Sequence, residues 1–261
     1  MTEQRVTIDI ANGIADVRLA RPDKMNALDP AMFEGIVAAG ERLRDEKGVR
    51  AVVLSGEGRA FCAGLDMASM ASGGTGAPLI ERTHGTSNLY QKVAMIWREL
   101  PMPVIAAVHG ICFGGGLQIA SGADIRIVSP ETRLSIMEMK WGLVPDMGGY
   151  ALWRRNVRED VLRKLTYTNA EFNGREAVEW GFATEVQDAP LERAKAIAAT
   201  IADRNPQAMR EAKALFNGSV DLDEAEILQA ESDAQARVIR QPNQIEAVMS
   251  QMEKRAANWK D

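Results

Sequence analysis

Alternating apolar and polar residues near the amino terminus predict a β-hairpin. Its two arms are residues 6–10 and 14–19, with Asn12-Gly13 between them. Such alternation is typical of strands with one buried face, and Asn-Gly is a favoured hairpin turn. Asp29 and Pro30 then supply an N-cap and a first-turn proline for a helix that runs to about Arg44.

Short apolar runs further along the chain predict strands that are buried on both faces, as in a parallel sheet. These strands cover residues 49–56, 104–108 and 125–128, with another extended piece at 133–136. Predicted helices cover about 86–99 and 116–121. The recurrence of strand, strand and helix predicts an α/β fold made of stacked copies of one repeating unit.

The pattern changes at residue 191, where an alanine-rich, helix-like sequence begins. Breaks at Asn205-Pro206 and near Asn217-Gly218 divide this sequence into several predicted helices. We therefore expect a core domain over residues 1–190 and a helical region over residues 191–261. The glycine-rich stretch 69–78 is expected to be a mobile loop.

Charge and cysteine content narrow the possible functions. The net charge of −5 and the pI of about 5.3 argue against a surface that coats nucleic acid, so no nucleic-acid partner is expected. Cys62 and Cys112 are the two cysteines, too few for a disulfide framework, which favours a reducing compartment. There is no amino-terminal apolar signal region and no run of the ~20 apolar residues that span a bilayer. We therefore expect a cytoplasmic protein without a membrane partner.

Two glycine-bearing segments carry the strongest chemical signal. They are residues 58–66 and 109–118, and each follows a predicted strand and opens a helix-like stretch. Glycines at a strand-to-helix turn leave backbone N–H groups uncovered, and the helix dipole adds partial positive charge there. Two such N–H groups converging from two turns would form an oxyanion hole.

These segments and the sequence around them resemble the crotonase superfamily, also called the enoyl-CoA hydratase/isomerase family. The motifs that carry the resemblance are Arg21-Pro22 through Asn26-Ala27-Leu28, residues 60–66, Gly114-Gly115-Gly116 and residues 142–149. The resemblance implies a crotonase (ClpP-like) spiral of strand–strand–helix repeats with a C-terminal helical region. It also implies acyl-CoA thioester substrates, and a homotrimer or dimer of trimers in which the helical region 191–261 contributes to assembly.

Matching the family motifs position by position assigns roles to this chain. The backbone N–H groups of Leu65 and Gly115 match the two oxyanion donors. Positions that match contacts to coenzyme A are Lys24, Met25, Ala27 and Ala63, with Arg21 and Arg59 as partners for its phosphates. Residues expected to line an acyl pocket are Met67, Met70 and Trp141, together with the methionines Met137, Met139 and Met147. No cofactor is expected beyond coenzyme A as part of the substrate, and no residues have metal-ligand spacing.

The acid–base positions decide the reaction. Family hydratases have two glutamates where this chain has Gln118 and Glu138. An amide can orient water or a carbonyl, but it does not exchange protons near neutral pH. Asp146 supplies a second carboxylate at a position where relatives that shift double bonds in dienoyl-CoA substrates have an acid. These three residues are the predicted catalytic set, and they favour double-bond isomerisation with Glu138 as the proton shuttle.

Three alternatives stay open at the level of the sequence. The first is enoyl-CoA hydration, with Asp146 helping to hold water. The second makes Asp146 a nucleophile on an aromatic acyl-CoA, as in dehalogenating relatives, although those lack a glutamate at the position of Glu138. The third, from a different class, is a CoA-binding protein without turnover, which the presence of Gln118 suggests.

Overall fold

A six-stranded sheet occupies the centre of the computed structural model, which describes residues 4–260. The strand order is β1-β2-β3-β4-β6-β8, and every neighbouring pair is parallel except β1 and β2. The strands are β1 (Val6–Ala11), β2 (Ile14–Leu19), β3 (Ala51–Gly56), β4 (Val104–Val108), β6 (Ile125–Val128) and β8 (Glu185–Val186). The predicted hairpin is confirmed, and its turn residues Asn12 and Gly13 have the positive φ values, 52° and 76°, of a type I′ turn.

A second sheet of two strands lies beside the first. It pairs β5 (Ile111–Phe113) with β7 (Arg133–Ser135) in parallel. Along the chain its strands alternate with those of the large sheet, and α4 (Gly115–Ser121) follows β5. This is the predicted recurrence of two strands and a helix. The sequence pattern does not predict β5, because three residues between two glycines are too few to establish a period.

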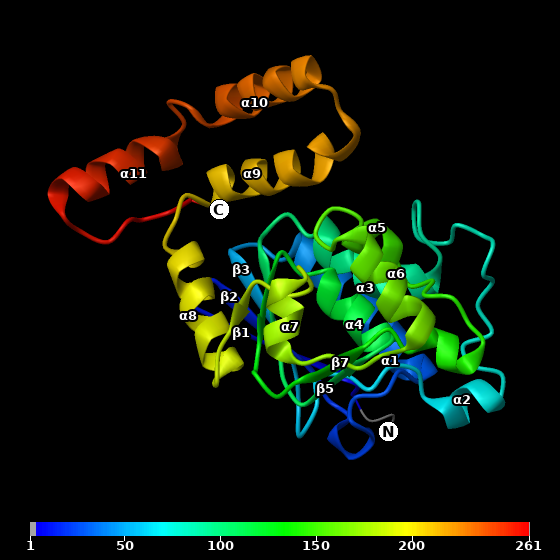
Figure 1. Ribbon diagram of the computed structural model, residues 1–261. Helices are drawn as coiled ribbons and strands as arrows, with labels where there is room; N and C mark the ends of the chain where they lie inside the picture. The colour runs from blue at the N-terminus through cyan, green and yellow to red at the C-terminus, as the bar shows by residue number, and fades with distance from the viewer. Residues whose placement is uncertain (1–3, 261) are drawn as a thin grey trace.

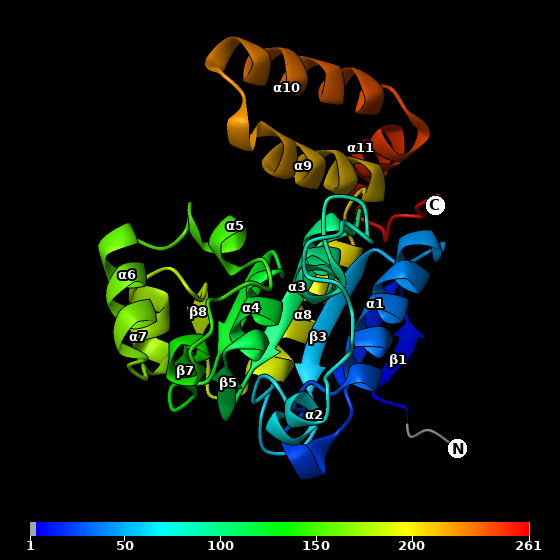
Figure 2. The ribbon, with the colours of Figure 1, turned by 90° about the vertical axis from the view of Figure 1, so that its right-hand side faces the viewer.

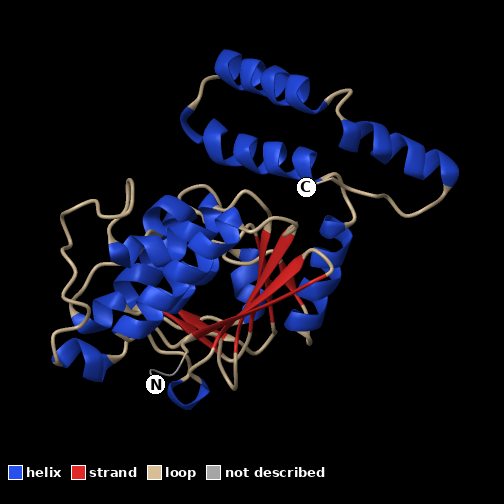
Figure 3. Ribbon diagram, turned by 180° about the vertical axis from the view of Figure 1, so that it is seen from behind, coloured by secondary structure: helices blue, strands red, loops and turns tan. Residues whose placement is uncertain are grey.

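The large sheet is covered on both faces, which explains why its central strands are wholly apolar. Val52 and Leu54 of β3 pack into the larger core with α1 (Pro30–Asp45), α3 (Leu89–Glu99) and α4. The alternate residues Ala51 and Val53 form a smaller core with α8 (Pro190–Ala202). Figure 1 shows the sheet between α8 on one side and α1, α3 and α4 on the other, and Figure 3 shows its strands fanning between the helices.

Helix starts follow local capping chemistry. The Asp29 side chain accepts a hydrogen bond from Met32 N at 2.8 Å, which confirms the predicted start of α1 at Pro30. α3 begins at Leu89, three residues later than predicted, because Asn88 and Gln91 form a reciprocal capping box there. The remaining helices are α2 (Met67–Ala71), α5 (Gly149–Trp153), α6 (Glu159–Thr168), α7 (Gly174–Glu179), α9 (Pro206–Gly218), α10 (Glu224–Val238) and α11 (Pro242–Glu253).

The C-terminal helices fall into two groups. α8 belongs to the cover of the large sheet through the buried residues Ala194 and Ala198. α9, α10 and α11 lie together at one end of the molecule, at the opposite end from α2 (Figure 2). A domain boundary at residue 190 and a role for the helices in assembly stay predictions.

One buried lysine fastens α9 to the rest of the fold. Lys213 Nζ donates hydrogen bonds to Trp97 O at 3.1 Å, Met102 O at 3.0 Å and Asp124 Oδ2 at 2.7 Å. Burial lowers the pKa of Lys213, while the carboxylate of Asp124 opposes that shift. All three ammonium hydrogens therefore have acceptors, as a buried charge requires.

We expect Lys213→Ala to lower the free energy of unfolding by about 2 kcal/mol, because two carbonyls and a carboxylate lose their donor. Urea denaturation of the two proteins measures the difference. Lys195→Ala is the matched control, since Lys195 is more exposed and its contact with Asp16 spans 3.5 Å. An effect of Lys213→Ala no larger than that of the control would contradict the role assigned to this lysine.

Candidate active site

The two glycine segments meet at one place. Phe61 N donates to His109 O at 3.0 Å, Cys62 N donates to Ile111 O at 3.1 Å, and Phe113 N donates to Cys62 O at 3.0 Å. The segment after β3 therefore runs beside β5, and both chains turn at the same level. A Cβ atom on Gly64 would lie 3.5 Å from Gly115 N, which shows how close the two turns come.

Each turn has an unpartnered backbone N–H group on a residue that lines a cavity. Within residues 4–260, Leu65 N and Gly115 N donate no hydrogen bond. Positive φ angles at the preceding residues, 85° at Gly64 and 50° at Gly114, produce this geometry. Both turns line a cavity of about 280 Å³. The structure therefore brings together the two groups predicted as oxyanion donors, beside a cavity that can hold a ligand.

The segment 24–28 braces the first turn. Ala63 N donates to Met25 O at 2.9 Å, Leu28 N donates to Gly64 O at 2.8 Å, and Asp66 N donates to Leu28 O at 3.1 Å. These bonds place Met25 and Ala63, two of the residues predicted to contact coenzyme A, side by side. Because the bonds lie on both sides of Leu65, they also hold its N–H group in a fixed direction.

Asn26 is a site-building residue to which the sequence analysis assigns no role. Its Nδ2 group donates to Ala60 O at 2.9 Å and to Glu57 O at 3.0 Å, and Phe61 O lies 3.2 Å away. The side chain is wholly buried, and its backbone has the left-handed φ of 55° that asparagine tolerates. The feature of the sequence that could have identified this residue is its place between Met25 and Ala27, two predicted contacts to coenzyme A.

The basic residues of the predicted CoA site lie in different environments. Arg21 is largely buried, and its Nη1 atom donates to Asp66 Oδ2 at 2.7 Å and to Ala27 O at 3.0 Å. Its guanidinium therefore fastens the turn, and a contact with phosphate stays a prediction. Lys24 and Arg59 are exposed, so their side chains are free to reach an anion outside the cavity.

Glu138 lies against the second turn. It begins the short 3-10 helix η2 (Glu138–Trp141), and a Cβ atom on Gly114 would be 3.3 Å from its Oε1 atom. The side chain is buried in the wall of the same cavity. Gln118 Nε2 donates to Glu138 Oε1 at 2.6 Å, whereas the buried Oε2 atom has no hydrogen-bond partner among the described residues.

Gln118 lies behind this carboxyl group and does not line the cavity. Its Oε1 atom accepts hydrogen bonds from Met147 N and Gly149 N, each at 2.9 Å. The residue is wholly buried within α4, and both of these donors belong to the turn that leads into α5. The structure thus connects two residues of the predicted catalytic set, Gln118 and Glu138, by a direct hydrogen bond.

Burial raises the pKa of Glu138 above its ordinary value, and the nearby negative charge of Asp146 raises it further. The Gln118 amide acts in the opposite direction by stabilising the carboxylate. The protein around Asp146 raises the pKa of that carboxyl group too, although its side chain is exposed. Asp146 does not line the cavity, so it influences Glu138 through its charge.

The pH dependence of stability follows from this raised pKa. Because the folded state holds the Glu138 proton more tightly than the unfolded state, folding stability falls as pH rises from the ordinary value of 4.5 through the raised one. We expect Glu138→Gln to remove this loss and to stabilise the protein at neutral pH, by about 1.4 kcal/mol for each unit of the shift. The gain disappears near pH 4, where both states are protonated.

Thermal unfolding of the two proteins between pH 4 and 8 measures this difference. A stability gain that stays constant across this range, or that is largest at acid pH, would contradict a raised pKa for Glu138.

Apolar and charged side chains together form the rest of the cavity wall. Of the predicted acyl-pocket residues, Met67 and Trp141 line the cavity, whereas Met70 does not. Met67 belongs to α2, so the loop predicted over 69–78 begins inside the last turn of a helix. Met137, another methionine predicted for the acyl pocket, also lines the cavity. Lining residues that the sequence analysis does not identify are Phe113, Arg133, Lys140, Leu143 and Glu171.

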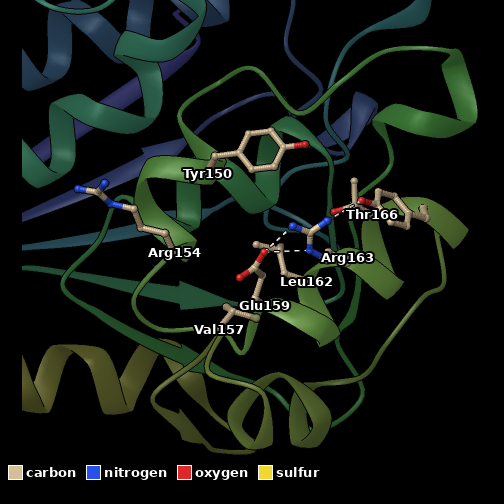
Figure 4. Close-up of a pocket in the computed structure, with 8 residues that line it drawn as sticks. Tyr150, Arg154, Val157, Glu159, Leu162, Arg163 and Thr166 are labelled. Carbon is tan, nitrogen blue, oxygen red and sulfur yellow. Dashed lines mark hydrogen bonds and ion pairs between the residues drawn. The ribbon is translucent and has the colours of Figure 1, made fainter.

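A second cavity, of about 400 Å³, lies between α5 and α6 (Figure 4). Its charged residues are paired: Arg163 Nη2 donates to Glu159 Oε1 at 2.6 Å, and Arg154 Nη2 donates to Asp221 Oδ1 at 3.1 Å. No residue of the predicted site lines it. The cavity with Leu65, Gly115 and Glu138 is therefore the candidate active site.

No group of three or more His, Cys, Asp or Glu side chains within residues 4–260 is arranged to hold a metal ion. Across the same residues, no helix has the length and apolar character needed to cross a bilayer.

Comparison with known proteins gives a consistent result. The family model described as "Enoyl-CoA hydratase/isomerase" matches residues 9–261. The mitochondrial Delta(3,5)-Delta(2,4)-dienoyl-CoA isomerase of Mus musculus is 30% identical over 93% of this chain and 77% of its own length. Carnitinyl-CoA dehydratase of Proteus mirabilis is 28% identical over 98% of both chains. The crystal structure of an enoyl-CoA hydratase from Bacillus anthracis has a TM-score of 0.88 at 28% identity, covering 98% of this chain and 99% of that one. The predicted fold is confirmed by this similarity.

Proposed function

Since the chain belongs to the enoyl-CoA hydratase/isomerase family, we propose that it moves the double bond of an enoyl-CoA thioester from the β,γ to the α,β position. The family as a whole acts on acyl-CoA substrates. Choosing this reaction within the family depends on the acid–base residues, because the fold and the oxyanion turns suit several reactions of thioesters.

In the proposed reaction, Leu65 N and Gly115 N bind the thioester oxygen. Glu138 removes an α-proton, and the electron pair of that C–H bond moves toward the carbonyl to form an enolate. The same carboxyl group then returns a proton to the γ-carbon, which leaves the double bond in conjugation with the thioester. Each oxyanion donor contributes ~3 kcal/mol to stabilising the enolate-like transition state.

The hydrogen bonding of Gln118 is the observation that carries this choice. The amide oxygen accepts from two backbone N–H groups, and the amide nitrogen donates to Glu138. Two-glutamate hydration needs a water molecule held between two carboxylates. Position 118, where the second carboxylate would be, is an amide in this chain. One carboxyl group with a raised pKa is sufficient for moving a proton from one carbon to another.

Hydration of a 2-enoyl-CoA is the second candidate. Asp146 is close enough to raise the pKa of Glu138 through its charge, so it is a possible second carboxylate for holding water. The Proteus mirabilis relative is named as a dehydratase, which supports hydration as the second candidate reaction.

The deciding experiment supplies a 3-enoyl-CoA and, separately, a 2-enoyl-CoA in heavy-oxygen water, with products followed by mass spectrometry. Isomerisation predicts that the 3-enoyl-CoA gives its conjugated isomer without gain of oxygen. Heavy oxygen in the product of the 2-enoyl-CoA, with no isomerisation of the other, would replace the proposal by hydration. No product from either, with acyl-CoA still bound, would favour the non-catalytic reading.

Assembly and location stay predictions. The homotrimer or dimer of trimers is implied by the family resemblance. A cytoplasmic location is an expectation from the sequence, and the mitochondrial relative from Mus musculus leaves the compartment open.

A further inference from the structure

We propose that Gln118 is a positioning residue that determines which oxygen of Glu138 exchanges the substrate proton. This inference rests on the proposed function, because it assigns a means of control to the same proton-transferring carboxyl group. Each hydrogen bond of the Gln118 side chain has a defined direction, because both ends of its amide contact protein groups.

The orientation of the Gln118 amide is fixed by its neighbours. Met147 N and Gly149 N both point a hydrogen at the same end of the side chain, at 2.9 Å. Only the oxygen can accept these hydrogens, because an amide nitrogen is a donor. The NH₂ group must therefore face Glu138, where it lies 2.6 Å from Oε1.

This orientation makes the two oxygens of Glu138 unequal. Oε1 already accepts a hydrogen bond from Gln118, which favours this oxygen as the one without the proton. Oε2 is buried and has no hydrogen-bond partner among the described residues. The carboxyl group therefore takes up its proton on Oε2.

The inequality has a chemical consequence. Oε2 accepts the α-proton as that C–H bond breaks, and the Oε2–H bond then breaks as the new bond to the γ-carbon forms. One atom performs both transfers, so removal and return take place on the same face of the substrate. A glutamate at position 118 would face Glu138 Oε1 with a second carboxyl oxygen, and the pair would have to share a proton.

Gln118 also joins Glu138 to the turn that carries Asp146. Its two acceptor contacts are to Met147 and Gly149, the residues that follow Asp146 along that turn. The amide oxygen lies close to this backbone, since a Cβ atom on Gly149 would be 2.8 Å from Gln118 Oε1. The amide therefore connects the carboxyl group to the backbone of this turn.

The test compares Gln118→Met with the unaltered enzyme. Methionine keeps the approximate volume but removes the donor to Oε1, so the carboxylate loses one stabilising contact. We expect the acid limb of the kcat/KM profile with 3-enoyl-CoA to move upward by about one pH unit, a loss of about tenfold on that limb. KM should change much less than kcat. Infrared difference titration of Glu138, with Glu138→Gln as the blank, should show the same upward shift without substrate.

Two further variants make the test decisive. Gln118→Glu keeps the size of the side chain and the acceptor for Met147 N and Gly149 N, so it replaces the methionine variant if that one does not fold. In Gln118→Glu the pKa of Glu138 should move upward at least as far as in Gln118→Met. Ser121→Ala is the control for a merely structural effect, because Ser121 Oγ accepts from Trp153 Nε1 at 2.8 Å on the same helix and does not contact Glu138.

The outcomes separate this inference from the proposed function. The positioning role would be overturned if the pKa of Glu138 and the pH profile of kcat/KM were unchanged in both Gln118 variants. An equal shift in Ser121→Ala would overturn it too, even if isomerisation is observed. A shifted titration in an enzyme that does not isomerise 3-enoyl-CoA would support the positioning role and reject the proposed reaction.

Discussion

Replacing Glu138 by glutamine is expected to lower kcat for isomerisation of a 3-enoyl-CoA by ~10³-fold, because general acid–base catalysis by a placed side chain contributes that order of rate. The amide keeps an acceptor for Gln118 Nε2, whose contact with Glu138 Oε1 is 2.6 Å long. The cavity should therefore keep its shape, and the Kd for acyl-CoA should change little. Steady-state kinetics and calorimetric titration measure the two quantities.

Glu159→Gln is the matched control, because it makes the same change at an exposed ion pair with Arg163 that lines the other cavity and not the candidate active site. It should retain the activity of the unaltered enzyme. If Glu138→Gln retained its activity as well, Glu138 would not be the proton-transferring group. If its binding of acyl-CoA were lost together with activity, a role in binding would explain the result.

The second large effect is expected at the first oxyanion turn. We expect Gly64→Ala to lower kcat by ~10²–10³-fold, the effect of losing one oxyanion donor. The added Cβ would lie 2.7 Å from Phe113 O at a residue whose φ is +85°, so the turn must move and carry Leu65 N with it. Because the contact is with backbone, neither side can yield by rotating a side chain.

Gly85→Ala controls for the strain of a positive φ alone. Gly85 has a φ of +70°, but an added Cβ would meet no atom within 4 Å. Kinetics and thermal unfolding of both variants separate catalysis from stability. Equal losses of kcat in the two variants, or a Gly64→Ala enzyme with undiminished kcat, would contradict the oxyanion role of this turn.

Much of the fold could be predicted because its signals are local. Asn12-Gly13 and Asp29-Pro30 define a turn and a helix start within a few residues, and the apolar runs of β3 and β4 reflect burial on both faces. β5 could not be predicted from the sequence, because only three residues form it and its pairing partner β7 lies some twenty residues further along the chain.

The parts of the site that are formed by backbone turns could be predicted from the sequence. The parts that depend on contacts between side chains could be predicted less well. The glycines indicated two turns with uncovered N–H groups, which the structure brings together near Leu65 and Gly115. The sequence could not indicate that Arg21 pairs with Asp66, or that both ends of the Gln118 amide have protein partners. Those contacts depend on how distant segments pack.

The most direct test of the proposed reaction follows the α-hydrogens of the substrate. A 3-enoyl-CoA carrying two deuterium atoms on the α-carbon is incubated with the enzyme, and the product is analysed by mass spectrometry and NMR. Removal of an α-proton by Glu138 predicts a conjugated product with one α-deuterium lost, a new hydrogen or deuterium on the γ-carbon and a primary isotope effect on the rate. Recovery of a bound acyl-CoA with both α-deuterium atoms in place would contradict it.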